Sequence, residues 1–396
     1  ASSTTMVMPF LSLYINTMGY FSTEYVHRWA GFVFGITFLT AFIFSPIWGR
    51  VGDKYGYKPV LLITGYGISA SLFFMGLMDT VHELFLLRFV QGAVTGFIPT
   101  SLAMIAAQTP KKKVGEVLGI LQTGNVTGTL FGPLIGGMMA DQFGFQYTFL
   151  YTSAAIFTAA TVVVFGVKEI RKKEKRENQK HFTQREVLQF IFHKRVLLTL
   201  MVITLLVQVA NFSIQPLLAI YVSMLTKTES IAFLAGLAFS ATGFGNLIAT
   251  RRWGKLGDRI GYEKVIMGLL IGGAVAFIPQ GLVTSLWQLV ILRFIFGMIT
   301  GGIRPLTTAY IRNISPIDIQ GEVNGYSVSF RFLGNVIGPV FGGAISGFIG
   351  IQAVFFVTSA ILFAAFLLLY FSVKKEISEK NTQHSGKTAV LFKSHH

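Results

Sequence analysis

Long apolar runs alternate with short polar segments along the whole chain, and this alternation is the main structural signal of the sequence. A helix that crosses the ~30 Å hydrocarbon core of a bilayer needs roughly 20 mostly apolar residues. The runs are continuous, which favours membrane helices over barrel strands. We therefore predict twelve spans, at roughly 1–18, 29–48, 60–78, 84–106, 115–140, 147–167, 196–222, 230–250, 265–283, 287–311, 322–345 and 351–373.

Composition supports a membrane protein and excludes other classes. The chain is 52% hydrophobic and 13% charged, with a mean hydropathy of +0.61, which is too apolar for a soluble domain. The absence of cysteine excludes a disulfide framework and a metal–thiolate site. The first run, ASSTTMVMPFLSLYI, is short because the chain begins inside it. We expect that the start of helix 1 is missing.

The positive charge of the chain is confined to one side of the predicted membrane. An even number of crossings places on one side the segments 49–59, 107–114, 168–195, 251–264, 312–321 and 374–396. These segments carry 27 of the 33 lysines and arginines, whereas the opposite loops carry Arg28 and Lys227. By the positive-inside rule, the basic side and both termini are cytoplasmic, in an inner (plasma) membrane. The net charge of +16 thus indicates topology and contact with anionic lipid, not nucleic-acid binding.

An internal repeat divides the chain into two halves. The stretch GRVGDKYGYKP, at 49–59, returns as GKLGDRIGYEK, at 254–264. Other matches keep almost the same offset, such as LLRFVQGAVTG with ILRFIFGMITG, and GPLIGG with GPVFGG. We predict a six-helix bundle at 1–167, a linker at 168–195, a second bundle at 196–373, and a tail at 374–396 whose last residues resemble an appended tag. Two parallel six-helix repeats around a central solute site are the architecture of a secondary transporter.

The motifs resemble those of the major facilitator superfamily, in its twelve-helix drug:proton antiporter branch, and most closely its MdtG-like multidrug efflux group. GRVGDKYGYKP is similar to the loop 2–3 signature of that superfamily, although Tyr57 stands at a usually basic position. RFVQG, at 88–92, is similar to the helix 4 motif. The resemblance implies an all-α membrane fold of twelve transmembrane helices in two pseudo-symmetric six-helix bundles.

Two acidic residues are predicted to act as latches on the basic side. Asp53 can accept hydrogen bonds from a helix N-terminus and interact with the positive end of its dipole. The resemblance implies that its target is the start of helix 11, near Gly321, and that Asp258 reaches the start of helix 5. The competing interpretation is that each segment makes only a tight solvated turn. The candidates for gating and coupling are Asp53, Lys54, Lys58, Arg88, Gln91, Glu116, Asp258, Arg259, Arg293 and Glu322, with His82 a weaker one.

Helix 5 carries a glycine pattern that resembles the antiporter motif of exporters. Small residues let membrane helices approach closely, and a proline removes one backbone donor and bends the helix. The pattern predicts a helix that hinges or seals the far side, although ordinary tight packing is the alternative. The residues of this packing motif are Gly128, Gly132, Pro133, Gly136 and Gly137, preceded by Gly119.

Arginines within the apolar runs are the most discriminating feature. Each costs roughly 2.5 to 3.5 kcal/mol on insertion scales and should face protein or water. Arg304 and Arg331 have no basic counterpart in the other half, where Pro99 and Asn125 stand, so we assign them to a central substrate cavity. All seventeen acidic residues fall in loops or at helix ends. The other predicted cavity residues are Gln215, Asn211, Tyr14, Tyr221 and Asn125.

These observations predict a secondary active exporter of amphipathic small molecules, which would confer multidrug or antibiotic resistance. The cavity arginines favour anionic or zwitterionic substrates, and proton-coupled antiport by alternating access is implied by the resemblance. A dedicated exporter of one anionic or siderophore-like metabolite, or a lipid translocator, remains open. The sequence has no G-x-x-x-x-G-K-[ST] loop for an ATP-driven pump and no catalytic constellation at membrane depth. We therefore expect no enzymatic activity, metal or cofactor, and a monomer whose partners are substrate, protons and lipid.

Overall fold

A computed structural model describes residues 5–110, 113–167, 169 and 184–393 of the chain. The first half contains η1 (Met8–Phe10), α2 (Leu11–Thr17), α3 (Thr23–Tyr55), α4 (Tyr57–Met75), α5 (Val81–Ala93), α6 (Phe97–Gln108), α7 (Val114–Phe143) and α8 (Phe145–Gly166). The second half contains α9 (Gln184–His193), α10 (Arg195–Ser213), η2 (Gln215–Leu217), α11 (Leu218–Leu225), α12 (Ile231–Ile260), α13 (Tyr262–Phe277), η3 (Ile278–Gly281), α14 (Leu286–Thr300), α15 (Ile303–Ile314), η4 (Ile317–Ile319), α16 (Gln320–Ile349) and α17 (Ile351–Lys393).

The predicted twelve-helix membrane fold is confirmed. Ten helices or broken helices of the described chain are long and apolar enough to cross a membrane. The short α2 and the glycine-rich α7 complete the set of twelve. Three spans are interrupted: α5 gives way to α6, α10 to α11, and α14 to α15. The first and last of these breaks contain glycine, which lowers the cost of leaving helical geometry.

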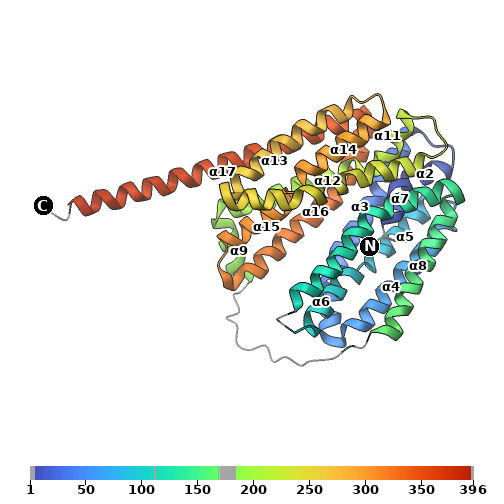
Figure 1. The fold of residues 1–396 in the computed structure, drawn as a ribbon, viewed down its shortest axis with the longest axis horizontal. Helices are drawn as coiled ribbons and strands as arrows, with labels where there is room; N and C mark the ends of the chain where they lie inside the picture. The colour runs from blue at the N-terminus through green and yellow to red at the C-terminus, as the bar shows by residue number, and fades with distance from the viewer. Residues whose placement is uncertain (1–4, 111–112, 168, 170–183, 394–396) are drawn as a thin grey trace.

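The linker and the tail differ from their predicted outlines. The predicted linker, 168–195, includes the helix α9, whose Val187 and Ile191 are buried. Residues 170–183 of the linker lie outside the described residues. The final helix does not stop near residue 373 but continues as α17 to Lys393, and it projects away from the bundle (Figure 1).

The internal repeat is visible in matching hydrogen bonds. Trp48 Nε1 donates to the carbonyl of Ala93 at 2.6 Å, and Trp253 Nε1 donates to the carbonyl of Met298 at the same distance. Each indole therefore ties the second helix of its half to the fourth. Equivalent residues make equivalent contacts, because the two halves are two copies of one packing arrangement.

The two halves meet along two helix pairs and separate toward the basic loops (Figure 1). The helix α3 packs on α16, and α7 packs on α12. We call the end where α3 and α12 begin the closed end. The opposite end, which carries the breaks at Gly56 and Gly261 and the connections around residues 110 and 315, is the open end. There, Gly49, Gly119, Gly254 and Gly321 have no heavy atom of another segment near the position of a Cβ atom.

Candidate functional site

Backbone contacts through glycine seal the closed end. A Cβ atom on Gly31 would overlap the carbonyl of Pro339, and one on Gly236 would overlap the carbonyl of Pro133. The two contacts are related by the internal repeat. In the same way, a Cβ atom on Gly343 would overlap the carbonyl of His27, and one on Gly137 would overlap that of Ala232. The seal therefore depends on small residues at matched positions of both halves.

The predicted motif of helix 5 contributes to this packing. Pro133 and Gly137 face α12, and Gly136 lies against the backbone of Met6. The carbonyl of Gly128 accepts a hydrogen bond from the Thr5 hydroxyl at 3.1 Å. The close approach is thus present, and the gating role of the motif stays a prediction.

A carboxylate joins the halves at the α7–α12 contact. Asp141, in the last turn of α7, accepts hydrogen bonds from the backbone N–H groups of Ala232, at 3.0 Å, and Phe233, at 2.7 Å. Both N–H groups belong to the first turn of α12, where no intrahelical partner exists and the helix dipole favours negative charge. Asp141 is therefore an N-cap supplied by the opposite half. Its counterpart in the repeat is Gly347, so this contact is asymmetric.

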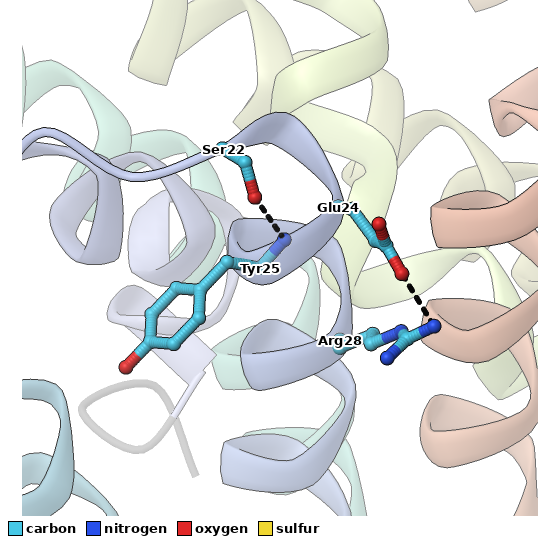
Figure 2. Close-up of polar contacts among 4 residues, drawn as sticks. All are labelled: Ser22, Glu24, Tyr25 and Arg28. Atoms are coloured by element: carbon cyan, nitrogen blue, oxygen red, sulfur yellow. Dashed lines mark hydrogen bonds and ion pairs between the residues drawn. The ribbon is translucent and has the colours of Figure 1, made fainter.

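Side chains also join the halves at the α3–α16 contact. Ser346 Oγ and His27 Nδ1 lie 2.8 Å apart. The Arg28 guanidinium lies over the ring of Phe348, 4.3 Å from its centroid, in cation–π geometry. Figure 2 shows how α3 presents Arg28: Ser22 caps the helix by accepting from the N–H of Tyr25, and Glu24 pairs with Arg28 one turn on. The closed end is thus held by polar contacts as well as by packing.

Removal of the Asp141 carboxylate is expected to weaken the closed end. An N-cap contributes about 0.5 to 2 kcal/mol, so Asp141→Ala should lower the ratio of closed to open molecules about 2- to 30-fold. Asp141→Asn should have a smaller effect because one acceptor oxygen remains. The chain has no cysteine, so spin labels on Tyr20→Cys and Leu282→Cys, both exposed at the closed end, report the separation of the halves.

The exposed acid Glu229, in the loop before α12, offers a matched control for Asp141. Glu229→Ala removes the same charge from the same end without removing the cap. An unchanged distance distribution in Asp141→Ala would contradict the role of the cap.

At the open end, the predicted latches to the other half are not formed in this conformation. Asp53 is exposed and accepts a hydrogen bond from the Tyr57 hydroxyl at 2.6 Å. Asp258 accepts one from the Tyr262 hydroxyl at 2.7 Å. Near the start of α16, a Cβ atom on Gly321 would meet no heavy atom within 4 Å. A contact from Asp53 to α16 therefore requires the open end to close.

The other candidates for gating and coupling divide between exposed and buried positions. Lys58 Nζ donates to the carbonyl of Val164 at 2.7 Å, which joins α4 to α8 within one half. Arg88 and Arg293 are buried, and Arg88 Nη1 donates to Gln91 Oε1 at 3.0 Å. His82 packs edge-on against Trp29. The exposed candidates are Lys54, Glu116, Arg259 and Glu322.

Two arginines lie together in the second half. Arg304, on α15, is exposed, and Arg331, on α16, is half-buried. The positive charge of Arg304 acts unfavourably on that of Arg331, and among the described residues neither forms an ion pair. Both lie within membrane-spanning helices, where a charge needs water, protein or a counter-ion. The arrangement leaves a double positive charge available to an anion.

The polar residues predicted to line the cavity with these arginines are partly accessible. Asn125, Asn211 and Gln215 are half-buried. Gln215 Oε1 has no hydrogen-bond partner among the described residues. A buried amide oxygen without a partner is costly, so this atom is available to a water molecule or a ligand.

The prediction that Tyr14 and Tyr221 line the cavity is wrong. Tyr14 is 3% exposed, and its hydroxyl donates to the carbonyls of Met75 and Met78 at 3.0 and 3.1 Å. Tyr221 is 1% exposed and donates to the carbonyl of Gln280 at 2.8 Å. Both tyrosines pack within the core of their own half, because each hydroxyl finds a backbone acceptor where an adjacent helix ends.

Sequence reasoning missed three contacts. Asp141 and His27 bridge the halves, and Glu169 caps α4 by accepting from the N–H groups of Tyr57, at 2.7 Å, and Lys58, at 3.1 Å. A signal existed for two of them: Asp141 matches Gly347, and His27 matches Ala232 at the offset of the repeat. The comparison between the two halves that singled out Arg304 would also have singled out Asp141 and His27. No such signal marks Glu169.

The chain is similar over nearly its whole length to known membrane transporters. It is 54% identical to an uncharacterized MFS-type transporter, YuxJ, of Bacillus subtilis, over 94% of this chain and 95% of that protein. It is 38% identical to the multidrug resistance protein MdtG of Salmonella arizonae, over 90% of this chain and 88% of that protein.

Solved structures share the fold at low sequence identity. A bacterial homolog of the human lysosomal transporter Spinster, in an inward-facing and unoccupied conformation, matches with a TM-score of 0.73 and 16% identity, over 94% of each chain. The human organic anion transporter MFSD10 matches with a TM-score of 0.62 and 15% identity, over 93% of this chain and 95% of that one. The family model of the major facilitator superfamily matches residues 1–249 and 225–395. The chain therefore belongs to the major facilitator superfamily and is a multi-pass membrane transporter.

Proposed function

We propose that this transporter is a multidrug exporter that alternates between an inward-open and an outward-open state. The basic loops at the open end support a cytoplasmic location for that end, so the closed end faces outward. The conformation described here is then inward-open and ready to load substrate. The similarity to MdtG proteins supports export of several compounds.

The proposed substrate class rests on the pair Arg304 and Arg331. The pair offers two positive charges and, among the described residues, no acid pairs with either arginine. Amphipathic anions and zwitterions complement that charge, whereas lipophilic cations are repelled. The arginines thus favour an anionic headgroup, and the apolar walls of the helices accept the rest of the molecule. A single bundle pair forms the whole site, so the monomer is the functional unit.

The proton gradient is the proposed energy source. Its electrical part supplies about 2.3 kcal/mol per charge for each 100 mV. The open-end acids Asp53, Glu116 and Glu322 are exposed and are candidates for proton exchange with the cytoplasm.

Uptake into inverted membrane vesicles under an imposed pH gradient tests the proposal. We expect protonophore-sensitive accumulation of an anionic amphiphile, and little accumulation of a cationic amphiphile of the same size. Vesicles without the transporter are the control. Preferential accumulation of the cation would contradict the substrate class, and anion accumulation that ignores the protonophore would contradict proton coupling.

A further inference from the structure

A buried histidine lies in the closed end, between the two halves. His27, in the second turn of α3, is 3% exposed. Its Nδ1 atom lies 2.8 Å from Ser346 Oγ on α16, and its carbonyl faces Gly343. Its Nε2 atom is buried and has no hydrogen-bond partner among the described residues. The imidazole is therefore enclosed by the interface that must part when the closed end opens.

Among the described residues that face His27 from the opposite half, none is charged. The facing end of α16 carries no titratable residue, and η2 carries none. On α3 itself, Glu24 is engaged by Arg28. On the adjacent α5, His82 packs edge-on against Trp29, and Glu83 is held in a capping box with Thr80. The other titratable groups near this end of the first half include Tyr14, Tyr20, Tyr25, Asp79 and Asp141, and the Asp141 carboxylate accepts from the N–H groups of Ala232 and Phe233.

The neutral imidazole fits this site better than the imidazolium. In either neutral tautomer, Nδ1 can share one hydrogen with the Ser346 hydroxyl, as donor or as acceptor. The charged form has two N–H donors, and only one faces an acceptor. Burial of a charge without a partner costs far more than burial of a neutral polar group. When α3 and α16 separate, water reaches both nitrogens and removes this penalty.

We infer that His27 is a proton-binding residue of the closed end, and that its protonation from the outside opens that end. The inference rests on the proposed alternation between inward-open and outward-open states. Outside acid then favours the outward-open state, in which an exporter releases its substrate. The sign follows from linkage: the closed end is favoured at high pH, and this preference is lost as the pH falls through the range in which histidine gains its charge.

The distance between the halves, measured against pH, tests the inference without any substrate. The label pair Tyr20→Cys and Leu282→Cys reports the closed end in purified protein. If His27 binds the proton tenfold more weakly in the closed state, acidification from pH 8 to pH 5 raises the open-to-closed ratio by up to about tenfold. In His27→Gln, which keeps a hydrogen-bonding side chain but cannot gain a charge, the ratio should stay constant over the same range.

Matched variants separate His27 from other groups. His82→Gln removes a histidine at the same end and should leave the pH response intact. His27→Asn provides a second neutral substitution if His27→Gln does not fold, as judged by size-exclusion chromatography. A wild-type distance that does not change with pH, or a response that survives in both His27 variants, would overturn the inference. The distance measurement requires neither substrate nor a proton gradient. A failure of the vesicle uptake experiment, which tests the proposed function, is therefore distinguishable from a failure of this inference.

Discussion

Replacement of Arg304 or Arg331 by alanine is expected to reduce uptake of an anionic amphiphile about 10- to 100-fold in inverted vesicles. A hydrogen bond to a charged group contributes about 1.5 to 3 kcal/mol, and every 1.4 kcal/mol changes affinity tenfold. The loss should be at the upper end for Arg331, which is half-buried and whose charge is less screened by water. Uptake measured at substrate concentrations below saturation reports the change directly.

The repulsion between the two arginines gives this prediction a second signature. Removal of one positive charge lessens the repulsion on the other. The loss of uptake in the double variant, expressed as a free energy, should therefore be smaller than the sum of the losses in the two single variants. Arg331→Lys keeps the charge and should retain part of the uptake. Arg312→Ala removes an exposed base at the open end, on the same helix as Arg304, and serves as the control. Undiminished anion uptake in both alanine variants would contradict an arginine-lined substrate site.

Replacement of Gly137 by valine is expected to reduce transport strongly by disfavouring the closed end. A Cβ atom at this position would overlap the backbone of Ala232 and Phe233, which cannot move without displacing α12. Overpacking of this kind costs about 1 to 3 kcal/mol and occasionally more. Because the clash exists only while the halves are in contact, the full cost falls on the closed state. The Tyr20–Leu282 label pair should report a longer distance, and vesicle uptake should fall about 5- to 100-fold.

A glycine on the same helix provides the control for Gly137. A Cβ atom on Gly124 meets no heavy atom within 4 Å, so Gly124→Val adds the same side chain to α7 without a clash. This variant should retain the short distance at the closed end. A short distance in Gly137→Val, or an equal loss of uptake in both variants, would contradict the role of Gly137 in the seal.

The sequence by itself determined the number of membrane spans and the division into two halves. Both follow from the apolar runs and from the 205-residue offset between Asp53 and Asp258, since any helix in a bilayer must satisfy its backbone internally. The sequence also showed that Arg304 and Arg331 have no basic counterpart in the other half. A charged residue within a membrane span is rare and usually functional.

Only the tertiary structure decided which residues face the other half. Tyr14 and Tyr221 are polar and lie within spans, as cavity residues do, but the backbone carbonyls that accept their hydrogen bonds come from helices some 60 positions away. Asp141 stands at a helix end like other solvated acids, and its two partners belong to α12. Local pattern fixes which helices form and how long they are. The partner of a polar group depends on how those helices pack across long sequence separations, and no local pattern encodes that.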